Sequence, residues 1–144
     1  MIVGWLKKFR SWNQERLRYK FRRTVLFAIF RKLVDGEPNR YQRKLLEALL
    51  KEKPFQEMGG SGHGRTSCRL AYALLKAGEG KKILLVSASK EESRRCQLWL
   101  QDKFIFDRAV DGQIFRGPGS IRFTSVRSMD VDIRGRQIDE TIFD

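Results

Sequence analysis

Hydrophobic residues in the first third of the chain recur at helical spacing. Intervals of three and four place the apolar residues of segment 1–34 on one face of a helix or a pair of helices. Leucines gathered on one face predict a short second helix over residues 40–50. The turn-forming cluster between the two is the expected boundary, which divides the chain into a basic amphipathic helical segment, 1–37, and a domain, 38–144.

The second half of the chain alternates between helical and strand patterns. Residues 81–89 contain a continuous aliphatic run, which is typical of a strand buried on both faces of a parallel sheet. A helix is expected before it, over residues 68–76, and another after it, capped by Ser89 and running through Leu100. This alternation predicts an α/β fold with a parallel sheet and right-handed crossovers.

The remaining strand signals are weaker. Residues 106–119 are expected to be irregular, and residues 121–126 alternate as a half-buried strand would. Thr141-Ile142-Phe143 is expected to form a short strand that ends on Asp144. Segment 54–58 would have to supply the strand that precedes the glycine-rich stretch, although it lacks an aliphatic run.

A glycine-rich stretch lies between the two helical patterns. It comprises Gly59, Gly60, Ser61, Gly62, His63, Gly64, Arg65, Thr66 and Ser67. The spacing of its outer glycines matches the phosphate-loop pattern G-x-x-x-x-G-K-[ST], with Arg65 in the lysine place and Thr66 in the hydroxyl place. Such a loop turns backbone N–H groups toward phosphate at a helix N-terminus. On these residues alone, a flexible linker is the equal alternative.

Asp144 gives the phosphate-loop interpretation a counterpart. An acid at the carboxyl end of a strand holds magnesium through water in phosphate-binding folds, while the loop hydroxyl, here Thr66, ligates the metal directly. The sequence therefore predicts that Thr66 and Asp144 lie close together, with ATP and Mg²⁺ as the implied ligands. No catalytic residue is identified.

Charge is the most unusual global property of the chain. Thirty Lys and Arg residues against 17 Asp and Glu give a formal charge of +13 in 144 residues. Such an excess predicts attraction to nucleic acid, to an acidic membrane surface or to an acidic partner protein. The apolar runs are too short for a membrane span and no signal peptide is recognisable, so a cytoplasmic protein is expected. Two cysteines and one histidine provide no zinc-binding set.

Several of these motifs occur in the order typical of one family. The motifs occur in this order along the chain: Gln42 in Arg-Tyr-Gln, the loop ending Gly-Arg-Thr, the strand over 81–89, Ile121-Arg122-Phe123-Thr124-Ser125, and Arg134-Gly135 before Ile142-Phe143-Asp144. Over residues 38–144 this resembles the N-terminal ATPase half of phage DNA-packaging terminase large subunits and, more distantly, superfamily-two helicases.

The resemblance implies a three-layer, P-loop NTPase-like parallel sheet preceded by the basic helical segment. It implies that Gln42 lies near the adenine and that residues 59–67 bind the nucleotide. DNA, a packaging or virion protein and a second copy of the chain are the implied partners, in the host cytoplasm if the chain is phage-encoded.

The sequence departs from this family at two points. Arg65 replaces the lysine, and the glutamate that follows the magnesium aspartate in the family has no counterpart, since the sequence stops at Asp144. Hydrolysis is therefore expected to be weak or absent, and the sheet incomplete. A non-enzymatic basic module for nucleic-acid binding or virion assembly is the alternative. A peripheral membrane protein anchored by residues 1–34 is a third hypothesis.

Overall fold

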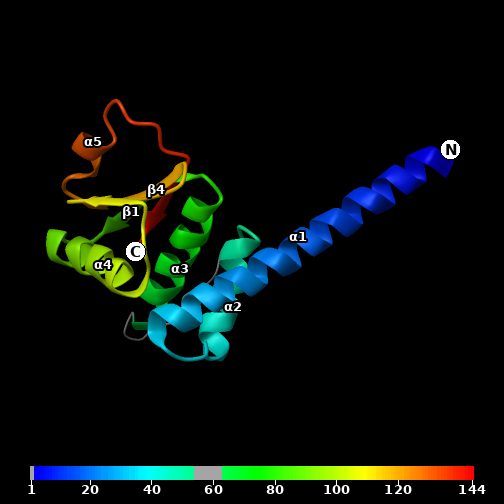
Figure 1. The fold of residues 1–144 in the computed structure, drawn as a ribbon, viewed down its shortest axis with the longest axis horizontal. Coiled ribbons are helices and arrows are strands. Elements are labelled where there is room, and N and C mark those ends of the chain that lie inside the picture. The colour runs from blue at the N-terminus through cyan, green and yellow to red at the C-terminus, as the bar shows by residue number, and fades with distance from the viewer. Residues whose placement is uncertain (1, 54–62) are drawn as a thin grey trace.

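A computed structural model of the chain describes residues 2–53 and 63–144 (Figure 1). The helices are α1 (Ile2–Val34), α2 (Arg40–Leu50), α3 (His63–Gly78), α4 (Lys90–Lys103) and α5 (Met129–Asp132). The strands are β1 (Lys82–Ser87), β2 (Arg108–Val110), β3 (Gln113–Arg116), β4 (Gly119–Ser125) and β5 (Glu140–Phe143). The expected α/β class with a helical N-terminal part is confirmed.

The sheet is mixed, which corrects the expectation of a parallel sheet. Its strand order is β2-β3-β4-β1-β5, and β1 runs parallel to both β4 and β5. Residues 106–119 were expected to be irregular, but they contain β2 and β3, which form a hairpin and pair antiparallel with each other and with β4. Strands of three and four residues are too short to show the alternation that identifies a strand in sequence.

β1 lies between two parallel neighbours, and its side chains alternate between the two faces of the sheet. Ile83 and Leu85 point to the face that carries the hydrophobic core. Their partners in register, Ile121 and Phe123 of β4 and Ile142 of β5, extend this core face across three strands. Lys82 and Arg122 belong to the other face.

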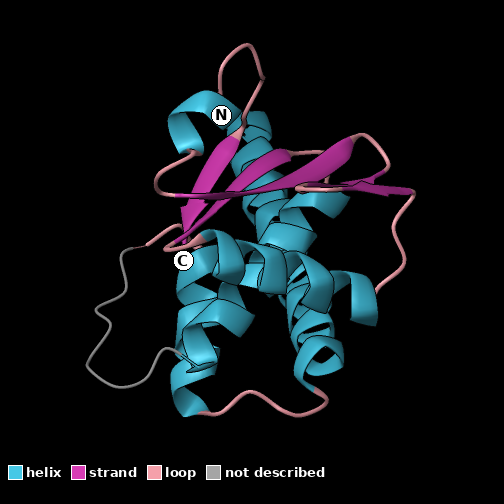
Figure 2. Cartoon of the chain, turned by 90° about the vertical axis from the view of Figure 1, so that its left-hand side faces the viewer, coloured by secondary structure: helices cyan, strands magenta, loops and turns pink. Residues whose placement is uncertain are grey.

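Helices α3 and α4 cover the core face, whereas α5 and the loop that follows it cross the opposite face (Figures 1 and 2). The order of the strands explains this arrangement. The connection from β1 to β4 and the connection from β4 to β5 run in opposite directions across the sheet. When two right-handed crossover connections run in opposite directions across a sheet, they lie on opposite faces of it. The four-residue α5 stands where a third layer of longer helices was expected.

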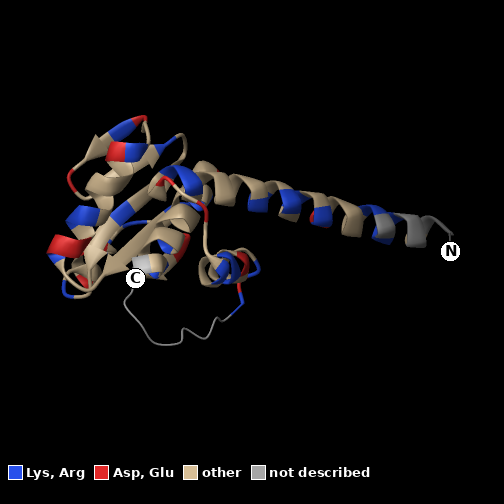
Figure 3. Cartoon of the chain, turned by 90° about the horizontal axis from the view of Figure 1, so that it is seen from below, with Lys and Arg blue, Asp and Glu red and all other residues tan. Residues whose placement is uncertain are grey.

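The first described residues form one helix, α1, of 33 residues. Its C-terminal half is part of the core, because Leu26, Phe30 and Leu33 are fully buried against the rest of the chain. Arg22 donates two hydrogen bonds to Glu79, at 2.8 and 3.0 Å, and so ties α1 to the end of α3. The N-terminal half of α1 projects from the body with Lys and Arg along it (Figure 3).

Within residues 2–53 and 63–144, the helices are all too short or too polar to cross a bilayer.

At Gly119, the first residue of β4, the end of α3 lies very close to the sheet. A Cβ atom at this position would lie 1.8 Å from the backbone oxygen of Ala77. Only glycine permits this approach, and the overlap is with backbone, which has little room to move.

We expect Gly119→Ala to lower the free energy of unfolding by about 3 kcal/mol or more, because the new methyl group separates α3 from β4. Urea denaturation followed by circular dichroism measures this change in the free energy of unfolding. Gly78→Ala is the matched control, since a Cβ there has no atom within 4 Å. It should leave stability unchanged or raise it by up to about 1 kcal/mol. Equal effects of the two substitutions would contradict the close approach.

Candidate functional site

The first turn of α3 meets the carboxyl end of β5. The Thr66 hydroxyl lies 3.1 Å from both carboxylate oxygens of Asp144 and donates its hydrogen bond to them. The two residues are 78 positions apart. Asp144 is held in place by its own backbone N–H, which donates to the carbonyl of Val86 at 2.8 Å and continues the pairing of β5 with β1. The predicted proximity of Thr66 and Asp144 is therefore confirmed.

Gln42 lies beside the same end of α3. It forms a capping box with Asn39: the Gln42 N–H donates to Asn39 Oδ1 at 2.8 Å, and the Asn39 N–H donates to Gln42 Oε1 at 2.9 Å. A Cβ atom on Gly64 would lie only 2.8 Å from Gln42 Nε2, so the amide packs directly against the glycine. Because the N-cap already occupies Oε1, the NH₂ group is the part of this side chain directed at α3.

Arg69 is a member of the site that the sequence analysis missed. Its Nη1 lies 3.5 Å from Asp144 Oδ1, and the two side chains are only 18% and 11% exposed. Arg69 stands three residues after Thr66, so both side chains share one face of α3. That spacing was the available signal. The partly buried guanidinium balances the Asp144 charge. A metal ion would compete with Arg69 for the carboxylate, and a phosphate would compete with Asp144 for the guanidinium.

Ser87 is the second residue that the sequence analysis missed. It ends β1 beside the end of β5, is 1% exposed, and its hydroxyl has no hydrogen-bond partner of normal geometry among the described residues. The Cys96 thiol is only a weak partner for this buried hydroxyl, so this edge of the sheet retains hydrogen-bonding capacity for another group.

The N-terminus of α3 favours an anion. Its first turn contains no acid, and Arg65 adds a positive charge there. Arg65 is half-buried and Ser67 is buried. The helix begins at His63, five residues before the predicted start, so that Thr66 falls within its first turn. Glycine at position 64 is a poor helix former, which is why the sequence pattern placed the start too late.

Part of the predicted site lies outside the described residues. This applies to Gly59, Gly60, Ser61 and Gly62, and to the segment 54–58 that was assigned as the preceding strand. His63 is the first residue of α3.

The donor set fits magnesium better than a metal held by protein alone. Among the described residues no group of three or more His, Cys, Asp or Glu side chains is placed to hold a metal ion. Mg²⁺ usually keeps several waters and takes one or two protein oxygens together with substrate phosphates. The hydroxyl of Thr66 and the carboxylate of Asp144 supply oxygens of this kind.

The two cysteines near the site are free and buried. Burial raises the pKa of the Cys68 thiol to about 12, against a small lowering by Arg69. Burial raises the pKa of Cys96 to about 11; the nearby Asp144 carboxylate raises it further, and the Ser87 hydroxyl acts in the lowering direction. Both thiols are protonated at neutral pH and are poor nucleophiles.

We therefore expect native protein to react with iodoacetamide at pH 8 at least ~100-fold more slowly than unfolded protein, since only the thiolate reacts. The rate should rise about tenfold per pH unit above pH 8 while the fold persists. Mass spectrometry of peptides containing Cys68 and Cys96 measures labelling, with protein in guanidinium as the control. Rapid labelling of native protein at pH 8 would show that the thiols are accessible as thiolates.

Comparisons with known proteins return no match: no family model, curated protein or solved structure is significantly similar to this chain.

Proposed function

We propose that this chain binds ATP at the N-terminus of α3, with Mg²⁺ held between Thr66 and, through water, Asp144. The observation that supports the proposal is the 3.1 Å contact between the Thr66 hydroxyl and the Asp144 carboxylate. In phosphate-loop proteins, a hydroxyl and a carboxylate in these positions share the magnesium ion that accompanies the nucleotide.

The location of the contact in the sheet supports a ligand site. Asp144 and Ser87 lie side by side at the carboxyl ends of two neighbouring parallel strands, β5 and β1. Ligands of open α/β sheets bind outside the carboxyl ends of the strands. A helix N-terminus and the fixed charge of Arg65 add positive potential at the same edge, which suits phosphate.

The residues favour binding over hydrolysis. Arginine in the lysine place keeps the charge and donates to phosphate in a planar fork, but it is bulkier than lysine and fits a tight loop less well. The Asp144 carboxylate is already paired with Arg69, which weakens its hold on a hydrated metal ion. The proposed activity is accordingly that of a nucleotide-binding domain of the terminase or helicase type with weak or no ATPase activity of its own.

Isothermal titration with ATP in the presence of Mg²⁺ tests the proposal. We expect Arg65→Ala to weaken ATP binding at least ~10-fold, because a charge-assisted phosphate contact is worth about 1.5–3 kcal/mol. Asp144→Asn should weaken the dependence on Mg²⁺, since only the Thr66 hydroxyl would remain to hold the ion, and leave metal-free binding largely intact. Arg94→Ala, on the exposed surface of α4, is the matched control and should bind as the unmodified chain does. An unchanged affinity in Arg65→Ala would contradict the assignment.

The second candidate function is nucleic-acid binding without nucleotide chemistry, and the projecting half of α1 favours it. Five cationic residues lie in positions 2–18 against one acid, and the described ones among them are exposed (Figure 3). A basic helix that stands away from the body presents its charge to a phosphate backbone without obstruction.

If α1 binds DNA, the logarithm of the binding constant for a 20-base-pair duplex should fall linearly with the logarithm of salt concentration. Replacing Arg10, Arg16 and Arg18 with glutamine should reduce the slope by up to about 3, since each phosphate contact contributes ~0.9. Fluorescence anisotropy measures it. Lys90, Arg94 and Arg95 of α4, exposed and equal in charge, provide the control triple replacement. Equal slopes for the two triple variants would argue against α1 as the contact.

A further inference from the structure

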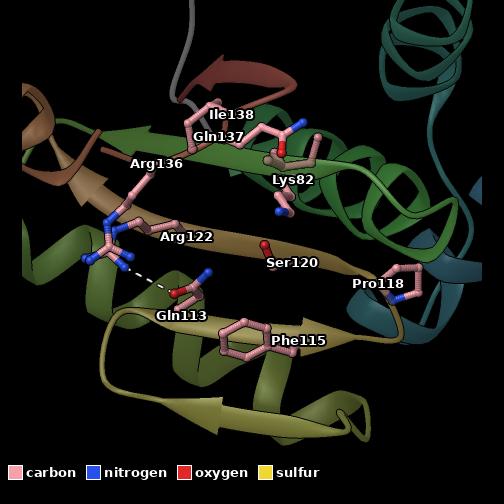
Figure 4. Close-up of a pocket in the computed structure, with 10 residues that line it drawn as sticks. Lys82, Gln113, Phe115, Pro118, Ser120, Arg122, Arg136, Gln137 and Ile138 are labelled. Atoms are coloured by element: carbon pink, nitrogen blue, oxygen red, sulfur yellow. Dashed lines mark hydrogen bonds between the residues drawn. The ribbon is translucent and has the colours of Figure 1, made fainter. Parts of the chain in front are cut away.

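A pocket of about 260 Å³ opens on the face of the sheet opposite α3 and α4, beneath the chain that leads into β5 (Figure 4). Its principal lining side chains come from three strands and that connection: Lys82, Gln113, Phe115, Ser120, Arg122 and Arg136. Lys82 begins β1, whereas Ser87 beside the candidate nucleotide site ends it. At ~3.3 Å per residue, the two ends of this strand are about 16 Å apart.

Arg122 is the partly buried cation of this pocket, with a side chain that is 18% exposed. Its Nη1 donates to Gln113 Oε1 at 3.1 Å, and its Nη2 lies 3.5 Å from Asp132 Oδ1. Its Nε is buried and has no hydrogen-bond partner in the described part of the chain. A guanidinium donor withdrawn from water without an acceptor is unfavourable. The pocket is therefore short of one acceptor at a fixed position.

Two further cations face the same space. Lys82 and Arg136 line the pocket, and neither side chain forms an ion pair with any described acid. Arg136 extends toward the end of the pocket occupied by Arg122 (Figure 4). Acids near the pocket are already engaged: Asp132 pairs with Arg122, Asp139 accepts the backbone N–H of Lys82 at 2.7 Å, and Asp107 accepts the backbone N–H of Gly117. None of these acids lines the pocket, so its three lining cations give it an excess of positive charge that favours an anion.

Phe115 adds a planar apolar surface next to these charges. Its ring is half-buried in the pocket wall, and the Arg108 guanidinium lies 5.4 Å from the ring centroid. An aromatic ring beside a row of cations is the arrangement on which the bases of single-stranded nucleic acid stack while their phosphates are neutralised. The volume lies just below the ~300–1,000 Å³ of pockets for drug-sized ligands, which suits one small unit.

We propose that this pocket binds one nucleotide unit, with its phosphate at Arg122, Arg136 and Lys82 and its base against Phe115. The unit can come from a free mononucleotide or from a single-stranded nucleic acid. The proposal is independent of ATP binding at α3, because it uses the other face and the other end of the sheet.

The test compares two probes, AMP measured by isothermal titration and a fluorescent 20-mer of deoxythymidine measured by anisotropy. We expect Arg136→Ala to weaken binding of at least one probe five- to twentyfold, and to lower the salt slope for the oligonucleotide by about 0.7. Arg136 is exposed, so its replacement leaves the fold intact. Phe115→Leu keeps an apolar side chain but removes the stacking surface, and should weaken the same probe at least fivefold.

Arg116→Ala is the matched control. Arg116 carries the same charge as Arg136, but it follows Phe115 on β3 and therefore points to the opposite face of the sheet. Each variant is also made in an Arg65→Ala background, which weakens any binding of AMP at α3. Loss confined to the oligonucleotide identifies a strand as the source, and loss confined to AMP identifies a free nucleotide. Binding of both probes within twofold of the unmodified chain in Arg136→Ala and Phe115→Leu overturns the proposal. A loss of probe binding in Arg116→Ala equal to that in Arg136→Ala also overturns the proposal.

Discussion

Parallel pairing of β1 on both of its edges is the constraint on which the rest of the structure depends. It aligns the carboxyl ends of β1 and β5, so that Ser87 and Asp144 come side by side although they are far apart in the chain. Helix α3 must then cross the core face with its N-terminus at that edge, which brings Thr66 to Asp144. Gly119 fixes the depth of the crossing, because any side chain there would push α3 off the sheet. The candidate site is therefore a product of the sheet's register, and local sequence alone does not create it.

The aliphatic run of β1, the Ser89 cap of α4 and the leucine face of α2 could be predicted because each is a local pattern that its own segment satisfies. The hairpin of β2 and β3 could not, since its strands are brief and their pairing depends on β4 being already in place. The proximity of Thr66 and Asp144 was predictable because each belongs to a recognisable pattern. Arg69 and Ser87 belong to none, and their membership of the site follows from which residues the fold makes neighbours.

The positive charge of the chain is divided between sites with different surroundings. On α1 it is solvated and spaced along an isolated helix, where salt screens it strongly. At Arg69 and Arg122 it is partly buried, held by carboxylates and less accessible to screening ions. The formal charge of +13 thus combines at least two sets of cationic side chains. The solvated set attracts polyanions from a distance, and the partly buried set orients a bound group.

Helix α1 also has a mechanical consequence. A straight helix of 33 residues is about 50 Å long, and its second half is clamped by packing and by the pairing of Arg22 with Glu79. The free half therefore extends from a fixed base that packs on α3, the same helix that contains Thr66. The second half of α1 packs directly against α3, so a partner bound at the tip of α1 would pull on a helix that is in contact with the candidate site. Any group held at the N-terminus of α3 would experience that pull as a change in its own geometry.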